Sequence, residues 1–194
     1  MKQVLEPLSA IPGVRIAVLV TSDGVPVVVR GRASERQTTG EIEAMRTAAF
    51  LTGEAIEAGI DLIRRSKPVR GSLRLEGKPL TSERVRLEID RALMDRGLRG
   101  EHTICAGGED GVDPHNDGSG PLKSGYPVIL DVFPRSETSG YHADITRTVF
   151  RGRPSKRQRE MWDAVFAAQE LGCEMTKPGA SGKAIHQAIQ ELFK

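Results

Sequence analysis

Two apolar segments, Pro127-Val-Ile-Leu-Asp-Val-Phe-Pro134 and Gly140-Tyr-His-Ala-Asp-Ile-Thr-Arg-Thr-Val-Phe150, each carry one aspartate in a strand-like pattern. If they form an antiparallel hairpin centred just after Glu137, Asp131 lies directly opposite Asp144. Opposite residues project from the same face of a sheet, with Cβ atoms roughly 5 Å apart. Two ionised carboxylates there repel by about 3 kcal/mol at an effective dielectric constant near 20. A cation between them relieves this repulsion, so the pair is a candidate metal site.

The pairing is inferred from spacing, and an aspartate in a strand is also typical of an edge or solvent-facing position. A slip of one residue would place the two carboxylates on opposite faces of the sheet. Thr146 lies two residues beyond Asp144 and therefore on the same face. Two interpretations of its hydroxyl stand side by side: it orients a metal-bound carboxylate or water, or Thr146 is an ordinary strand residue.

Further motifs surround the aspartates. The most specific is Gly140-Tyr-His-Ala-Asp-Ile-Thr-Arg-Thr148, and the others are Ala106-Gly-Gly-Glu-Asp-Gly111, Asp113-Pro-His-Asn-Asp-Gly118, Leu122-Lys-Ser-Gly125, Val128-Ile-Leu-Asp131 and Lys177-Pro-Gly179. Together they resemble the pita-bread metallopeptidases, the family of methionine aminopeptidase, Xaa-Pro aminopeptidase, prolidase and creatinase. The resemblance is strongest to the Xaa-Pro aminopeptidase and prolidase branch.

The resemblance implies a metal-dependent peptidase. Asp131 and Asp144 would be two of the family's five ligands, two Asp, one His and two Glu, which hold two divalent ions. Such ions lie about 3.5–4 Å apart and activate a water molecule that attacks the peptide carbonyl. His115 would be the substrate-side histidine, donating to the carbonyl oxygen or developing oxyanion. Mn, Co, Zn and Fe are not distinguished, because oxygen ligands accept several metals.

The chain departs from the family pattern in two places. Arg135-Ser-Glu-Thr-Ser139 lengthens the turn between the aspartates, and an even number of added residues preserves their facing relation. In the family, the ligand His and both ligand Glu lie further toward the C-terminus than Lys194, so we expect a C-terminally truncated fragment. His186 falls in an amphipathic helical pattern and is expected to be a helix-surface residue, not a substitute ligand.

The first 33 residues are distinct in pattern. Two β-branched runs flank Thr21-Ser-Asp-Gly24, a signal for a hairpin turn. The opening weakly resembles roadblock/LC7 modules, whose dimerisation would allow a homodimer. A remnant of the domain that precedes the catalytic domain in Xaa-Pro aminopeptidases is an equal interpretation. Residues 34–194 are expected to be the N-terminal part of the pita-bread catalytic domain.

The remaining pattern predicts helices on a mostly antiparallel sheet, an α+β architecture and here an incomplete pita-bread fold. We expect a polar linker over residues 31–40 and a long helix from Glu41 to the region of Pro68. Thr81, Ser155 and Ser181 are candidate N-caps of three further helices. Strands are expected over residues 102–106, 126–133 and 141–151.

Composition restricts the function classes. The 194 residues are 38% hydrophobic and 28% charged, enough for one domain with a real core. A net charge of +2 gives no indication of a nucleic-acid partner, and the longest apolar run, Ile16-Ala-Val-Leu-Val20, is too short to span a membrane.

Cys105 and Cys173 lack ligand spacing and are expected to be core residues. The Met1-Lys-Gln start shows no signal-peptide pattern, which favours the cytoplasm.

The sequence therefore predicts a metallo-aminopeptidase of the Xaa-Pro type that acts on peptides in its complete form. The alternative function is a non-catalytic pita-bread module that binds a peptide or a protein. The candidate site residues are His115, Asp131 and Asp144.

Overall fold

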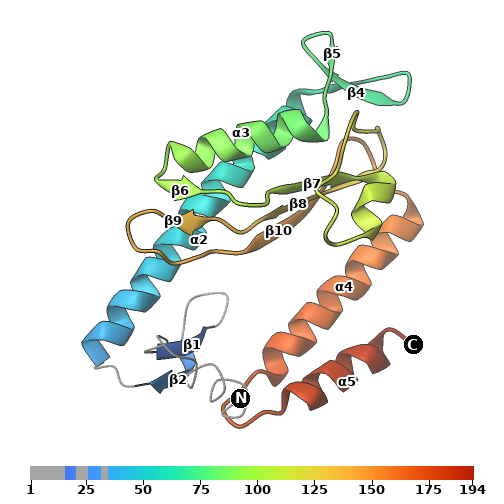
Figure 1. The fold of residues 1–194 in the computed structure, drawn as a ribbon. Helices are drawn as coiled ribbons and strands as arrows, with labels where there is room; N and C mark the ends of the chain where they lie inside the picture. The colour runs from blue at the N-terminus through green and yellow to red at the C-terminus, as the bar shows by residue number, and fades with distance from the viewer. Residues whose placement is uncertain (1–15, 21–25, 32–34) are drawn as a thin grey trace. The chain divides into compact units, whose positions relative to one another are not determined.

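The computed structural model describes residues 16–20, 26–31 and 35–194, with side-chain surroundings from residue 39 onward. The chain divides into two compact units, Ala44–Pro154 on one hand and Met1–Glu43 with Ser155–Lys194 on the other. Figure 1 shows the elements of both units along the chain. The expected domain boundary between residues 33 and 34 lies outside the described residues and stays a prediction.

The unit Ala44–Pro154 contains most of helix α2 (Glu35–Arg65) and all of helix α3 (Ser82–Met94), with strands that form three small sheets. One sheet has the order β10-β8-β7, with both pairings antiparallel. Its strands are β7 (Ile104–Gly107), β8 (Pro127–Val132) and β10 (Ile145–Phe150). The other strands are β3 (Lys67–Val69), β4 (Ser72–Leu75) and β5 (Lys78–Pro79), in one sheet, and β6 (Leu98–Arg99) and β9 (Arg135–Ser136), in another.

The side chains of strand β8 alternate between a buried face of the sheet, called the closed face, and a more accessible one, called the open face. Val128, Leu130 and Val132 are buried, whereas Ile129 and Asp131 between them are half-buried. The buried side belongs to one hydrophobic core with α2 and α3, which lie on that side of the sheet in Figure 1. Its helix residues include Ala55, Ile56, Ile63, Val85, Ile89 and Leu93. Each fully buried aliphatic side chain contributes about 1.5–3 kcal/mol, which holds β8 in one orientation.

Helix α2 (Glu35–Arg65) begins earlier than the sequence pattern predicts. The expected linker over residues 31–40 is therefore wrong for its second half. Glu35, Arg36 and Gln37 have high helix propensity, so the helix extends through this polar stretch without an apolar face. Its end agrees with the prediction, because α2 stops three residues before Pro68.

The N-caps of the later helices are confirmed. The Thr81 hydroxyl accepts a hydrogen bond from the backbone N–H of Arg84, at 3.3 Å, where α3 begins. Ser155 and Gln158 form a complete capping box at the start of α4 (Lys156–Met175). Ser181 caps α5 (Gly182–Leu192). Caps of this kind are each worth about 1 kcal/mol.

The unit formed by the two ends of the chain also contains strands β1 (Ile16–Val20) and β2 (Pro26–Gly31). They pair antiparallel, as predicted. The Thr21–Gly24 turn and residues 1–15 of the roadblock-like opening lie outside the described residues. Cys173 on α4 is exposed, so the expectation of a core position holds only for Cys105. Within the described ranges, no helix combines the length and the hydropathy needed to cross a membrane.

The loop before β8 supplies a test of the packing. Gly118 has φ +78°, and an added Cβ would lie 2.0 Å from the Cys105 carbonyl oxygen. Gly118→Ala is expected to lower the free energy of unfolding by about 3 kcal/mol or more, because strain and overlap add. Gly120→Ala is the control, with φ +66° and open space around its Cβ, and it should lose about 1–2 kcal/mol. Urea denaturation measures both, and equal losses would contradict the close contact between this loop and β7.

Candidate metal centre

The register of the hairpin differs from the prediction. Thr146, and not Asp144, lies opposite Asp131. The turn is the cause: Arg135 bridges to His142, and Gly140 is in the left-handed region at φ +73°. The loop therefore spans residues 137–140 instead of centring after Glu137, and the predicted direct pairing of Asp131 with Asp144 is wrong by two residues.

The two aspartates nevertheless remain on one face of the sheet. A register error of two residues leaves the alternation of faces unchanged. Asp144 immediately precedes β10, two residues from the direct partner of Asp131. Diagonal neighbours of this kind lie roughly 7–8 Å apart at the backbone, within reach of converging side chains. The pair occupies the open face, where Asp131 is half-buried and Asp144 is exposed.

Thr146 contacts the Asp131 carboxylate directly. Its Oγ1 donates a hydrogen bond to Asp131 Oδ1 at 2.6 Å. This bond is the contact that the orienting interpretation of the threonine requires, and the choice between the two interpretations stays a prediction. A hydrogen bond from a neighbouring hydroxyl restricts the rotation of a carboxylate and presents its other lone pairs in a fixed direction.

The environment of Asp144, including the charge of Asp131, acts on its carboxyl group. Partial burial raises the pKa of the Asp144 carboxyl, and the negative charge of Asp131 raises it further. This is the direction predicted for two carboxylates that share a face. A divalent cation bound between them would reverse the effect, because it favours the ionised form of both.

His115 lies in the loop that follows the short 3-10 helix Gly108–Val112, and its side chain is exposed. Its backbone N–H donates to Asp113 Oδ1 at 2.9 Å. Two residues later, the Asp117 carbonyl accepts from the Cys105 N–H at 3.0 Å, so the loop runs along the edge of β7. Strand β7 is one strand spacing, about 5 Å, from β8, and the loop lies on its outer side, about 10 Å from β8. That His115 faces the same substrate as the two aspartates stays a prediction.

The residues present fit part of a metal site. Two carboxylates on one face suit a hard or borderline divalent ion. His142, two residues before Asp144, is exposed and lies opposite Arg135. In the described part of the chain, no three His, Cys, Asp or Glu side chains gather to hold an ion. The thiol of Cys105 offers no alternative, because burial raises its pKa to about 12.

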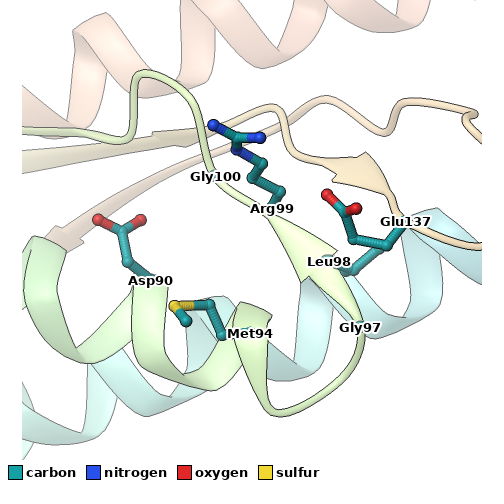
Figure 2. A pocket seen from close by; sticks show the side chains of 7 residues that line it. All are labelled: Asp90, Met94, Gly97, Leu98, Arg99, Gly100 and Glu137. Atoms are coloured by element: carbon teal, nitrogen blue, oxygen red, sulfur yellow. The ribbon is translucent and has the colours of Figure 1, made fainter.

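A cavity of about 500 Å³ lies elsewhere in the unit, beside the C-terminal end of α3 and strand β6. Figure 2 shows the carboxylates of Asp90 and Glu137 on either side of the Arg99 side chain. The residues that line the cavity are Asp90, Met94, Gly97, Leu98, Arg99, Gly100 and Glu137. None of the three predicted site residues contributes to it, so it is separate from the candidate metal centre.

Comparison with known proteins identifies the family. Residues 43–194 match the model of metallopeptidase family M24. The chain belongs to this family. It is 31% identical over 191 residues to Xaa-Pro aminopeptidase 2 of Streptomyces coelicolor, covering 94% of this chain and 40% of that protein. It is 28% identical over 159 residues to the Xaa-Pro dipeptidase of Pyrococcus furiosus, covering 81% of this chain and 42% of the relative.

Solved structures agree on the fold of this M24 chain. The prolidase from Pyrococcus furiosus superposes with a TM-score of 0.68 at 21% identity, covering 100% of this chain and 46% of that one. The X-Pro aminopeptidase from Thermotoga maritima has a TM-score of 0.66 at 23% identity, with 80% and 41% covered. The architecture is thus an incomplete pita-bread α+β fold, as predicted. The chain spans about two fifths of the length of the curated relatives named above.

The coupling of the aspartates can be measured by NMR titration of the metal-free chain. Asp131→Asn removes the neighbouring charge, so the Asp144 pKa should fall toward its ordinary value of 3.8 and stay above it because of burial. Asp95→Asn, at the exposed C-cap of α3, should leave it unchanged.

The raised pKa of Asp144 also makes the stability of the fold depend on pH. Because the folded pKa of Asp144 is raised, this group costs stability above its folded pKa, and the cost disappears as the pH falls toward 3.8. Asp131→Asn should reduce that pH dependence. An Asp144 pKa at its ordinary value in the unmodified chain would show that the two carboxylates do not share a face.

Proposed function

We propose that this M24 chain carries part of the catalytic site of an Xaa-Pro aminopeptidase or prolidase, with Asp131 and Asp144 as metal ligands. The observation that supports it is the coupled pair of carboxylates on the open face of the β8–β10 hairpin. Asp144 lies within the motif Gly-Tyr-x-x-Asp-Ile-Thr-Arg-Thr that carries the family resemblance, and Asp131 lies in β8, the strand that pairs with β10. The proposed substrate is a peptide with proline at its second position.

The chain's own residues have distinct roles in this proposal. Asp131 and Asp144 hold divalent ions, two in the complete enzyme, and Thr146 fixes the direction of the Asp131 carboxylate. The ions, when bound, supply an activated water and polarise the scissile carbonyl. His115 donates a hydrogen bond to the oxygen of that carbonyl as negative charge develops on it. The open face is where the peptide lies, because the closed face is filled by the core.

A second candidate function is a non-catalytic pita-bread module that binds a peptide or protein. The observation in its favour is that the described residues provide two carboxylates and no third ligand for an ion. A two-ion site needs further side chains to fix both ions and the water between them. The two functions differ in what the intact gene product does with a peptide, which cleavage assays distinguish.

The proposed activity is tested with an Xaa-Pro peptide and added Mn²⁺ or Co²⁺. The 194-residue chain should show no measurable turnover, whereas a version extended through the C-terminal strands of its relatives should cleave. Asp144→Ala in the extended version should lose essentially all activity, with Asp95→Ala, at the exposed C-cap of α3, as the control. Turnover by the short chain, abolished by Asp144→Ala, would show that the remaining ligands lie within it. An inactive extended version that still binds the peptide would favour the binding module.

Thr146 provides a finer test. Thr146→Val keeps the shape of the side chain and removes the donor to Asp131, so affinity for Mn²⁺ should fall about 10-fold or more. Thr148→Val is the matched control, on the same strand and face but opposite Ile129. Calorimetry or Mn²⁺ relaxation measures the Mn²⁺ affinity of each variant. Equal affinities in the two variants would mean that Thr146 is an ordinary strand residue.

A further inference from the structure

The loop that carries His115 is held by hydrogen bonds within it and by hydrogen bonds to neighbouring elements. Within the loop, the Gly118 N–H donates to Asn116 Oδ1 at 2.8 Å, and the Asn116 N–H donates to the Asp113 carbonyl at 3.1 Å. These bonds shape the loop without fixing its place. The His115 side chain is exposed, so packing does not fix its position.

Helix α3 supplies side chains that attach the loop to the core. Arg86 Nη1 donates to the carbonyl oxygens of Asp117 and Gly118, the latter at 2.5 Å. The Asp117 carbonyl also accepts from the Cys105 N–H of β7. Further along, Glu83 Oε1 accepts from the Gly120 N–H at 2.9 Å. That bond is the main cause of the lowered pKa of Glu83.

Arg86 acts nearest to His115. Its two acceptors are the second and third residues after the histidine in the chain, whereas Glu83 reaches the fifth. A charged donor forms stronger bonds to carbonyls than a neutral one. Arg86 also lies on the helix that contributes Val85 and Ile89 to the core. The position of the loop is therefore coupled to a rigid element.

We propose that Arg86 is a positioning residue for His115: it holds the loop against β7 and so sets where the histidine stands relative to Asp131 and Asp144. This rests on the proposed function, because His115 and the two aspartates are the site that it assigns. Arg86 touches none of the reacting groups in this proposal. It acts through the carbonyls of Asp117 and Gly118.

The test uses Mn²⁺ as a paramagnetic probe and NMR of the whole chain. Bound Mn²⁺ broadens nearby protons with a steep distance dependence, so the Thr146 amide reports the ion and the His115 ring reports the loop. Arg86→Met should leave the broadening at Thr146 unchanged and reduce it severalfold at His115. Arg86→Lys, which restores a charged donor, should recover the original pattern. Arg91→Met is the control, because Arg91 is an exposed arginine on the same helix.

A second readout needs no metal. The Cys105 N–H donates to the same Asp117 carbonyl as Arg86, so its hydrogen exchange should become severalfold faster in Arg86→Met and stay unchanged in Arg91→Met. If the ion broadens nothing near Thr146 in the unmodified chain, the proposed metal site fails, and the exchange rate still decides the role of Arg86. Unchanged His115 broadening and unchanged Cys105 exchange in Arg86→Met would overturn the proposal. If that variant does not fold, Arg86→Gln, whose shorter side chain cannot span both carbonyls, is read in the same way.

Discussion

The antiparallel pairing of β8 with β10 is the constraint on which the candidate site depends. It places Thr146 opposite Asp131 and brings Asp144 to the same face. Side chains alternate between faces along a strand, so a change of register by an odd number of residues would separate the two carboxylates. The loop over residues 137–140 and the left-handed Gly140 set the register. A turn that supplies no proposed ligand thus determines whether the two aspartates can bind one ion.

The core keeps that register in place from the other side of the sheet. Val128, Leu130 and Val132 are buried beneath the helices, and exchanging the faces of β8 would expose all three while burying Asp131. Burial of a charged carboxylate without partners costs far more than the exposure of one aliphatic side chain. Helix α3 contributes to the core and to the loop of the candidate histidine. Its apolar side packs in the core, and its Glu83 and Arg86 side chains hold that loop.

Much of this arrangement follows from local sequence, and the rest does not. The caps at Thr81, Ser155 and Ser181 were predictable because a hydroxyl three residues before a free backbone N–H satisfies that donor in most contexts. The shared face of the two aspartates was predictable because it requires only the parity of their separation. Their direct pairing was not, since parity does not determine the length of a turn. Long-range contacts also escaped prediction: Arg86 reaches carbonyls 31 and 32 residues further along the chain, and no periodicity in the sequence signals such a contact.

Whether Asp131 and Asp144 together bind a divalent ion decides the proposed function, and a crystal of the chain grown with Mn²⁺ tests this most directly. We expect an anomalous difference peak within coordination distance of an oxygen of each aspartate, with the Thr146 hydroxyl still bonded to Asp131. Ordered Mn²⁺ at other carboxylates, with none between these two, would contradict the assignment of the pair as metal ligands.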